Sequence, residues 1–374
     1  MSFIPYSRTF TGEKAMHYLQ DVVETGLLAG EGKYTHLSEE ILSRITTNQN
    51  TLLTPSCTDA LEMASMLMGL KPGDEVILPS FTFTSAAIAV TKFGATPIFV
   101  DINDQDLNVN TNSVLEAITK KTKALSYVNY GGFGANVEAL IKELKGSGIY
   151  VVEDNAHGFG GEFDGKKLGL TGDFSVHSFH GTKNIQCGEG GSIQFSDPDY
   201  FDQAHVLRQK GTNRRDYIDG RVNKYSWVGS GSSFLASELQ AAVLYSQLED
   251  YDLIQEKRYK IWNMYAEGIK ETEIFRKPPR ENRYAHTAHI FYLRLQSPDL
   301  RTKFIEHMQK HEIQVTSHYE ALHKSLAAKK YGANENGCPV AEKVSATLIR
   351  LPIWVEMSIN EIERVIEATN SFQN

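Results

Sequence analysis

The stretch Tyr150-Val151-Val152-Glu153-Asp154 reads as a short buried strand that ends in two acids, and Ser178-Phe179-His180-Gly181-Thr182-Lys183-Asn184 follows further along the chain. A lysine amine can form a Schiff base with the aldehyde of pyridoxal 5'-phosphate (PLP). A carboxylate beneath the pyridine nitrogen keeps that nitrogen protonated, so that the ring can accept electrons from a substrate carbanion. Asp154 and Lys183 therefore predict a catalytic site built around PLP.

Short apolar runs alternate with helical runs on both sides of this stretch. The sequence predicts further strands at 52–54, 75–79, 97–101, 124–128, 174–177 and 192–195, and helices at 61–68, 85–93 and 137–145. Alternation of this kind predicts βαβ units and a mainly parallel sheet with helices on both faces. We therefore expect an α/β fold with a large domain of this type.

The pattern changes after Gly211, where a polar stretch at 212–224 begins. It is followed by a helical run at 235–265, a strand at 290–295, a helix at 301–310, a strand at 314–316 and a final helix at 360–372. This order predicts a smaller C-terminal α/β domain. We expect residues 1–250, with the N-terminal segment, to form the large cofactor-binding domain and residues 251–374 to form the small one.

Composition excludes several classes of protein. The chain has 374 residues, of which 41% are hydrophobic and 22% charged, so a large ordered core is expected. A formal net charge of −8 argues against a general nucleic-acid binder. Three widely spaced cysteines fit a reducing cytosol and match no zinc or disulfide pattern. With no signal peptide or membrane-spanning run, we expect a soluble cytoplasmic protein without a metal.

Other informative residues follow the expected strands. Cys57 and Thr58 stand where a helix begins, and the free N–H groups of a helix N-terminus attract phosphate, although an ordinary helix cap would explain the same residues. Phe83 follows the next strand and is placed to stack on a planar ring, or to lie in the core. His157, three residues after Asp154, suits either the phenolic oxygen of that ring or a structural role.

Two competing sites are poorly supported. His177 and His180 suggest a metal, but residues three apart on an extended segment point to opposite faces. Gly131, Gly132 and Gly134 follow a strand without spelling the glycine fingerprint of a nicotinamide-binding fold.

The motifs, taken in order, resemble those of the nucleotide-sugar aminotransferases, a family of PLP fold type I within the aspartate aminotransferase superfamily. The segments that carry the resemblance are 55–58, 79–83, 153–157, 178–184 and 237–242. This resemblance implies that Lys183 is the Schiff-base lysine and proton carrier and that Asp154 binds the pyridine nitrogen. It also assigns further cofactor contacts, namely Phe83 to the ring, His157 to the phenolic oxygen, and Cys57, Thr58 and Ser178 to the phosphate.

Many relatives also place an asparagine from the neighbouring subunit on the cofactor phosphate. In this sequence Ser233 stands at that position, in the run Gly231-Ser232-Ser233. The resemblance therefore implies a homodimer with shared active sites.

One branch of the family matches best, at 53–58, 178–180, 210–214, 224–227 and 231–233. It implies transfer of an amino group from L-glutamate to C4 of a dTDP-4-keto-6-deoxyhexose, in dTDP-sugar biosynthesis for lipopolysaccharide or O-antigen. The expected substrate contacts are His180, Lys210, Arg214, His318 and Tyr319, with Arg215 and His323 as further possibilities.

The alternatives within this fold are a 3-keto or UDP-linked substrate, a PLP-dependent sugar dehydratase, or a non-catalytic PLP-binding regulator. Lys183 argues against the dehydratase, because that branch has histidine in place of the lysine.

Overall fold

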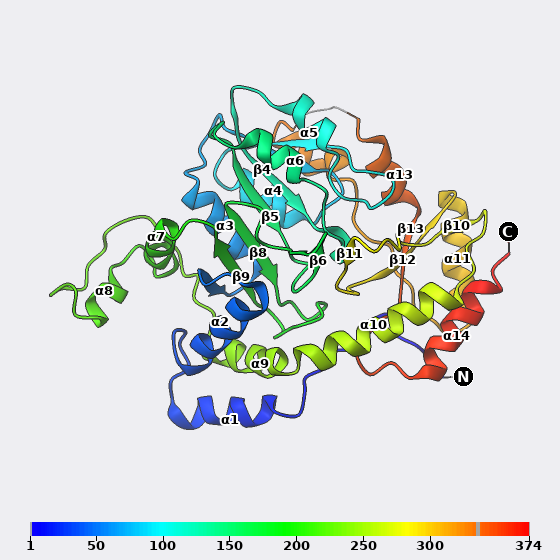
Figure 1. Ribbon diagram of the computed structural model, residues 1–374, viewed down its shortest axis with the longest axis horizontal. Coiled ribbons are helices and arrows are strands. Elements are labelled where there is room, and N and C mark those ends of the chain that lie inside the picture. Colours follow the sequence, from blue (N-terminus) through cyan, green and yellow to red (C-terminus); the bar gives the residue numbers. More distant parts are fainter. Residues whose placement is uncertain (1, 334–336, 374) are drawn as a thin grey trace.

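The computed structural model describes residues 2–333 and 337–373 (Figure 1). Its centre is a sheet of seven described strands in the order β1-β9-β8-β5-β4-β2-β3. These strands are β1 (Thr51–Thr54), β2 (Glu75–Pro79), β3 (Thr96–Val100), β4 (Thr122–Val128), β5 (Tyr150–Asp154), β8 (Phe174–Ser178) and β9 (Gly191–Phe195). Of these strands, β9 runs antiparallel to both neighbours and the other pairings are parallel. The predicted α/β fold with a mainly parallel sheet is confirmed.

Successive side chains of the central strands enter two different cores, because neighbouring residues of a strand point to opposite faces. Val76 and Leu78 of β2 lie in one core with α3 (Cys57–Leu67) and α4 (Thr84–Thr91). Ile77 between them lies in another core with α5 (Thr111–Ala117) and α6 (Glu138–Leu144). Val152 and Val151 of β5 divide in the same way. Both faces of the sheet are therefore buried, which explains why its strands contain few charges.

The helices around this sheet form the two covering layers. Their bounds are α1 (Ala15–Thr25), α2 (Lys33–Thr46), α3 (Cys57–Leu67), α4 (Thr84–Thr91), α5 (Thr111–Ala117), α6 (Glu138–Leu144), α7 (Asp199–Arg208) and α9 (Glu238–Glu249), with a short 3-10 turn at Tyr130–Gly132. A small sheet of β11 (Tyr284–Ala285), β6 (Glu162–Phe163) and β7 (Lys166–Lys167) lies beside them.

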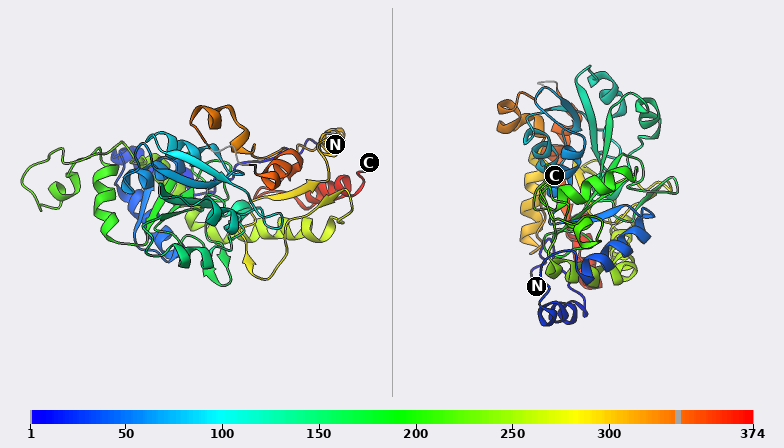
Figure 2. Two further views of the ribbon diagram at one scale, coloured as in Figure 1. Left: turned by 90° about the horizontal axis from the view of Figure 1, so that it is seen from above. Right: turned by 90° about the vertical axis from the view of Figure 1, so that its left-hand side faces the viewer.

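The C-terminal part contains a second three-stranded sheet in the order β10-β12-β13. It is formed by β10 (Phe275–Arg276), β12 (Phe291–Leu295) and β13 (Leu348–Leu351), and the helices of this part are α10 (Tyr251–Gly268), α11 (Pro298–Lys310), α12 (Leu326–Lys330), α13 (Pro339–Thr347) and α14 (Ile359–Asn370), with a 3-10 turn at Leu322–Lys324. Both chain termini lie beside this part (Figures 1 and 2). Ile4 is fully buried in the core of the C-terminal part, so the N-terminal segment packs there.

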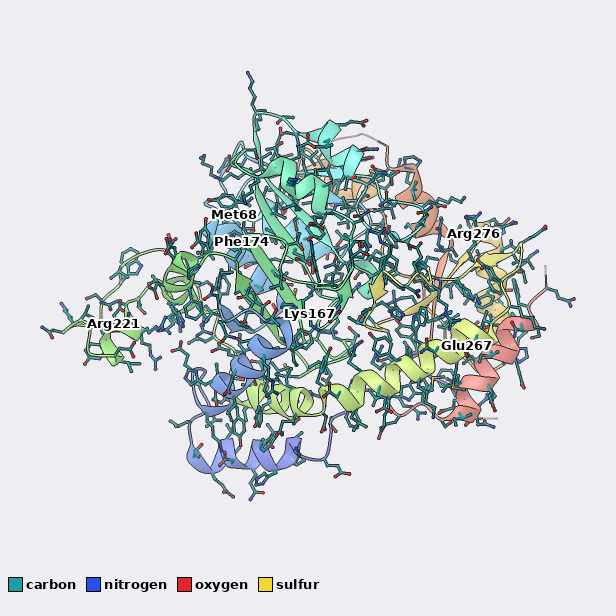
Figure 3. All side chains as sticks on the ribbon, in the orientation of Figure 1. Met68, Lys167, Phe174, Arg221, Glu267 and Arg276 are labelled. Atoms are coloured by element: carbon teal, nitrogen blue, oxygen red, sulfur yellow. The ribbon has the colours of Figure 1, made fainter. Side chains whose placement is uncertain are left out.

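A long loop extends from the end of α7 and carries α8 (Arg214–Ile218) (Figures 1 and 2). We call residues 209–233 the arm, because isolated bridges join Gln209 to Ser233 and Thr212 to Trp227 at its base. Figure 3 shows Arg221 on the arm, far from Phe174 in the central sheet. No helix among the described residues is both long enough and apolar enough to cross a membrane.

Two predictions about the second half of the chain are wrong. Residues 314–316 form no strand, because Ile313 pairs with Ile4 while Thr316 pairs with Arg350, each through an isolated bridge. The helical run predicted at 235–265 is two helices, α9 and α10, separated at Asp250. The first begins only after Ser237, whose side chain accepts a hydrogen bond from the Gln240 N–H in a capping box that ends the preceding extended segment.

Candidate active site

A cavity of ≈ 610 Å³ opens at the carboxyl ends of β4, β5 and β8. The loop that follows β8 also lines it. Ligands of open parallel sheets collect at this edge, where strands are followed by loops and helix N-termini. Most of the residues predicted for the site line the cavity together, namely Cys57, Thr58, Phe83, Asp154, His157, Ser178, His180, Lys183, His318 and Tyr319. The chain therefore brings them to one place from segments more than 250 residues apart.

Asp154 is the acid that faces the cavity at the end of β5. Glu153 points the other way, where its carboxylate accepts hydrogen bonds from the N–H groups of Gly169 (2.7 Å) and Thr171 (3.0 Å). Asp154 is 5% exposed, and its Oδ1 accepts the Ala156 N–H at 3.0 Å. Burial raises the pKa of Asp154 to about 6, since no cation of the described chain forms an ion pair with it. A protonated ring nitrogen would supply the missing partner.

Lys183 lies in the loop after β8, on the same cavity as Asp154. Burial lowers the pKa of the Lys183 amine to about 8, because the ammonium form is poorly solvated there. A larger fraction of the amine is therefore neutral near physiological pH than in an exposed lysine, as a nucleophile for an aldehyde requires. The fit to PLP rests on these two groups: a buried acid without a cation and a partly neutral amine.

The part of the cavity wall at the start of α3 suits a phosphate. Ser56 caps the N-terminus of α3, and the following N–H groups belong to Cys57 and Thr58. A Cβ on Gly191 would lie 2.5 Å from the Cys57 nitrogen, so only glycine permits this close approach of β9 to the helix start. Thr58 Oγ1 lies 2.7 Å from Ser85 Oγ, and Ser178 lines the same cavity. Free N–H groups and hydroxyls of this kind can hold a phosphate.

His157 forms a hydrogen-bonded pair with Tyr319. The Gly131 N–H donates to His157 Nδ1 at 3.2 Å, so the proton of the neutral ring is on Nε2, which lies 2.9 Å from the Tyr319 hydroxyl. Burial holds the pKa of His157 well below its usual range, so the ring is neutral. The rings of His157 and His289 are tilted by 31° to each other, with centroids 4.4 Å apart. Whether His157 approaches a cofactor oxygen remains a prediction.

Phe83 and His180 lie near the mouth of the cavity. Phe83 is 55% exposed, and its ring centroid lies 6.0 Å from that of Tyr319. His180 is exposed; its Nδ1 accepts the Thr182 N–H at 3.3 Å, and its Nε2 lies 3.7 Å from Glu189. An exposed aromatic ring beside a cavity can stack on a planar ligand at little cost in reorganisation.

Lys210, Arg214 and Ser233 do not line this cavity, because all three belong to the arm. Arg214 donates to Glu31 at 2.8 Å within the same chain. Arg215 pairs with Asp202 on α7. His323 is also outside the cavity: it contacts Ser80 and Glu342.

The cavity includes residues that sequence reasoning missed. Tyr6, Arg258, His289 and Arg350 all line it. Arg350 had a detectable signal, because it is a charged residue in the otherwise apolar strand Leu348–Leu351. The others had none: Tyr6 follows no strand, and Arg258 lies on the buried side of a long helix.

Comparison with known proteins identifies a family model that matches most of the chain. The model of the DegT/DnrJ/EryC1/StrS aminotransferase family matches residues 10–370. The spore coat polysaccharide biosynthesis protein SpsC of Bacillus subtilis is 28% identical to this chain, over 98% of the chain and 96% of SpsC.

Two solved structures share the fold over almost the whole chain. The aminotransferase TlmJ from Streptoalloteichus hindustanus has a TM-score of 0.89 and 26% identity, with 99% of this chain and 97% of TlmJ covered. Spr1654 of Streptococcus pneumoniae, provisionally assigned as a sugar aminotransferase and solved in its PLP form, has a TM-score of 0.91 and 25% identity over 99% and 98%.

Proposed function

Because the chain belongs to the DegT/DnrJ/EryC1/StrS aminotransferase family, we propose that it transfers the amino group of L-glutamate to C4 of a dTDP-4-keto-6-deoxyhexose. The products would be a dTDP-4-amino-4,6-dideoxyhexose and 2-oxoglutarate, so the sugar exchanges its keto oxygen for the amine. At the coarser level the protein is a PLP-dependent sugar aminotransferase. The observation that carries the proposal is the buried pair of Asp154 and Lys183 on one cavity.

The proposed roles follow from the chemistry of each group. PLP, when bound, supplies an electron sink for the negative charge left on a carbon that has lost its proton. Asp154 would hold the proton of the pyridine nitrogen, and the neutral amine of Lys183 would take a proton from the α-carbon of glutamate. In the second half of the reaction Lys183 would return a proton to C4 of the sugar.

The remaining cavity residues would hold and orient the cofactor. We assign the N–H groups of Cys57 and Thr58 and the Ser178 hydroxyl to the phosphate, because they meet at the N-terminus of α3. Phe83 would stack on the ring and exclude water from one face. His157, neutral and fixed in one tautomer, would donate from Nε2 toward the phenolic oxygen once that hydrogen bond replaces the one to Tyr319.

We also propose that the protein is a homodimer and that the arm of one subunit reaches the cavity of the other. The arm extends from the body in Figures 1 and 2 and exposes apolar side chains, with Trp227 82% and Ile218 61% exposed. Exposed apolar residues on an extended loop favour contact with another surface. Lys210, Arg214 and Ser233 would then act on the partner's ligands, Ser233 at the cofactor phosphate.

The choice of sugar rests on branch-level sequence resemblance, chiefly at 56–58, 211–214 and 231–233. The last two segments pack tightly at the base of the arm. A Cβ on Gly211 would lie 1.9 Å from the Gly229 carbonyl oxygen, and one on Gly231 would lie 2.0 Å from the Gly211 nitrogen. This packing supports a fixed arm geometry, on which a nucleotide contact would depend.

A competition assay tests the substrate. The PLP-loaded protein receives glutamate with dTDP-4-keto, dTDP-3-keto and UDP-4-keto sugars in turn. We expect the highest kcat/KM for the dTDP-4-keto sugar, since misplacing the reacting carbonyl by about 1 Å can cost on the order of a hundredfold in rate. The thymine preference over uracil should lie within about 10–200-fold if it rests on one methyl contact. A higher kcat/KM for a 3-keto or UDP sugar would contradict the substrate while leaving the aminotransferase intact.

A further inference from the structure

Asn184, the residue after Lys183, connects the lysine loop to the C-terminal part. Its amide Nδ2 donates hydrogen bonds to Gln255 Oε1 at 3.0 Å and to the Thr287 carbonyl at 2.7 Å, and its Oδ1 lies 3.1 Å from His289 Nδ1. Gln255 lies on α10, and the other two partners belong to the segment that leads into β12. The position of Asn184 is therefore set by the C-terminal part as well as by its own loop.

The backbone of Lys183 is held on both sides along the chain. On one side, the Lys183 N–H donates to the His180 carbonyl at 2.8 Å. On the other side, Asn184 makes the contacts described above, and Ile185 is buried in the same core as Ala241 of α9. A lysine side chain has many rotamers, so a fixed backbone limits the positions that its amine can reach. Asn184 thus limits where the Lys183 amine lies in the cavity.

The same amide fixes the tautomer of His289. Asn184 Nδ2 already donates to two oxygens, so Oδ1 is the atom that faces the ring and accepts the proton on His289 Nδ1. The other ring nitrogen, Nε2, is then unprotonated and can accept a hydrogen bond. Among the residues that the structure describes, none forms a hydrogen bond with His289 Nε2, and His289 lines the same cavity as Lys183.

The segment around His289 is itself held firmly. The fully buried Ala288 has a φ of 51°, in the left-handed region that residues with a side chain rarely adopt. Arg258 donates to the Ala288 carbonyl at 3.2 Å and to the His289 carbonyl at 2.6 Å. Thr287 Oγ1 donates to the His157 carbonyl at 2.6 Å, so the segment also contacts the loop after β5. Backbone strain of this kind persists where surrounding bonds fix it, and it is common at functional sites.

His289 suits an ammonium group as a partner. Burial holds the pKa of His289 well below its usual range, and the positive charge of Lys183 lowers it further, so the ring is neutral near pH 7. A neutral ring with an unprotonated Nε2 accepts a hydrogen bond without adding a second positive charge. His157 cannot take this part, because its own Nε2 carries the proton and faces the Tyr319 hydroxyl.

From this arrangement we propose that Asn184 is the positioning residue of Lys183, and that His289, oriented by the same amide, accepts a hydrogen bond from the Lys183 ammonium. The inference rests on the proposed function, in which the Lys183 amine takes a proton from the α-carbon of glutamate and later returns one to C4 of the sugar. The electrons of the broken C–H bond stay with the carbon, and only the proton moves to the amine. One N–H of the resulting ammonium would donate to His289 Nε2 and keep the proton beside the reacting carbon.

The first test measures how fast PLP attaches covalently to the apoprotein between about pH 6 and about pH 10, a readout that needs no turnover. It compares wild type with Asn184→Ala, His289→Phe and His289→Gln. Asn370→Ala is the matched control: Asn370 also joins two segments, through the Gly268 carbonyl (2.8 Å) and the Lys270 N–H (2.9 Å), but lies outside the cavity. Urea unfolding confirms that each variant is folded.

We expect the midpoint of the pH profile to fall by about 1 unit in Asn184→Ala and in His289→Phe, because the ammonium loses its acceptor and the neutral amine is favoured. His289→Gln, whose amide carbonyl can still accept, should recover part of the shift, and Asn370→Ala should match wild type. The other groups that act on the pKa of Lys183 are unchanged in these variants, namely Cys57, Asp154 and Arg350. An unchanged midpoint in either Asn184→Ala or His289→Phe would overturn the proposal.

The second test asks whether Asn184 acts through Lys183. With excess glutamate, Asn184→Ala should slow 2-oxoglutarate release on the order of 10–100-fold. In Lys183→Ala supplied with methylamine in place of the lysine amine, adding Asn184→Ala should change the rate by less than about threefold. An equal loss in both backgrounds would overturn the proposal, because Asn184 would then act on the cofactor or substrate. A wild type that shows the expected pH shifts between variants but releases no 2-oxoglutarate would contradict the proposed function alone.

Discussion

Lys183 and Asp154 line the same cavity from the ends of adjacent parallel strands, β8 and β5, yet they form no ion pair with each other. Each has a pKa shifted by burial toward its neutral form, to about 8 for the amine and about 6 for the carboxyl. An ion pair would have stabilised both charged forms instead. A PLP bound in this cavity would be held by Lys183 through its aldehyde and by Asp154 through its ring nitrogen.

Asp154→Asn should slow the reaction on the order of 10²–10⁴-fold, the range for loss of a group that stabilises developing charge. The amide cannot hold the ring nitrogen protonated, so the carbanion-forming step loses its electron sink. The rate of 2-oxoglutarate release from glutamate measures this step. Asp164→Asn, at an exposed acid paired with Arg283, is the control. A near-wild-type rate in Asp154→Asn would reduce the carboxylate to a cap for the Ala156 N–H.

The pKa of Lys183 predicts how the apoprotein takes up PLP. Only the neutral amine attacks the aldehyde, and burial lowers its pKa to about 8. The rate of covalent attachment at saturating PLP should rise about fivefold from pH 7 to pH 8 and level off above about pH 9. The rate of attachment is measured from the growth of the visible absorbance band. A steady tenfold rise per pH unit up to pH 10 would mean that the amine titrates like an exposed lysine.

The strand pattern and the chemistry of its ends were predictable from the sequence. Val151, Val152 and Asp154 combine an apolar period with an acid at the carboxyl end, and this signal is local. The pairing of Ile4 with Ile313 was not predictable, because no local pattern links residues that far apart. That pairing is also why residues 313–316 form bridges with two different segments instead of a strand.

The cavity wall formed by the C-terminal part was missed for the same reason. Arg350 and Arg258 become cavity residues only in the folded chain, where β13 and α10 lie beside the strand ends of the large sheet. The predicted ligand contacts of Lys210, Arg214 and Ser233 depend on a second subunit, because all three lie on the arm and outside the cavity of their own chain.

Shared active sites should be detectable by complementation. We would mix chains bearing Lys183→Ala with chains in which residues 214–228 of the arm are replaced by a short glycine-serine linker. Each parent is expected to be inactive, and a mixed dimer should recover activity at one site, where an intact arm meets an intact lysine. Product formation after verified subunit exchange is the readout. Absence of recovery would show that each chain completes its own site.

Arg208 should be essential for folding stability. It is 1% exposed and donates to Glu31 and to Glu39, each at 2.8 Å. Arg208→Met removes the buried cation that Glu31 and Glu39 share and leaves Glu31 with the half-exposed Arg214, so we expect a loss of about 3–5 kcal/mol in the free energy of unfolding. The control Arg221→Met, at a half-exposed surface pair, should lose less than about 1 kcal/mol. Urea unfolding measures both, and equal losses would contradict the prediction.

The same network predicts a pH dependence. Burial would raise the pKa of Glu31, but hydrogen bonds and charge from His205 and Arg208 outweigh it and lower the pKa from 4.5 to about 2. A lowered folded-state pKa contributes stability that is present above the unfolded value and lost as the pH falls. The difference between wild type and Arg208→Met should therefore be complete near pH 7 and shrink between pH 4.5 and about 2. A difference that stays constant over this range would contradict the assignment.

The most direct test of the account follows a single turnover with glutamate and no sugar. The PLP-loaded wild type and Lys183→Ala, reconstituted with PLP, each receive excess L-glutamate, and 2-oxoglutarate is counted against the concentration of active sites. We predict one 2-oxoglutarate per wild-type site with loss of the visible absorbance band, and none from Lys183→Ala on the same time scale. Release of 2-oxoglutarate by Lys183→Ala at a rate near that of wild type would contradict the claim that Lys183 carries the proton transfer.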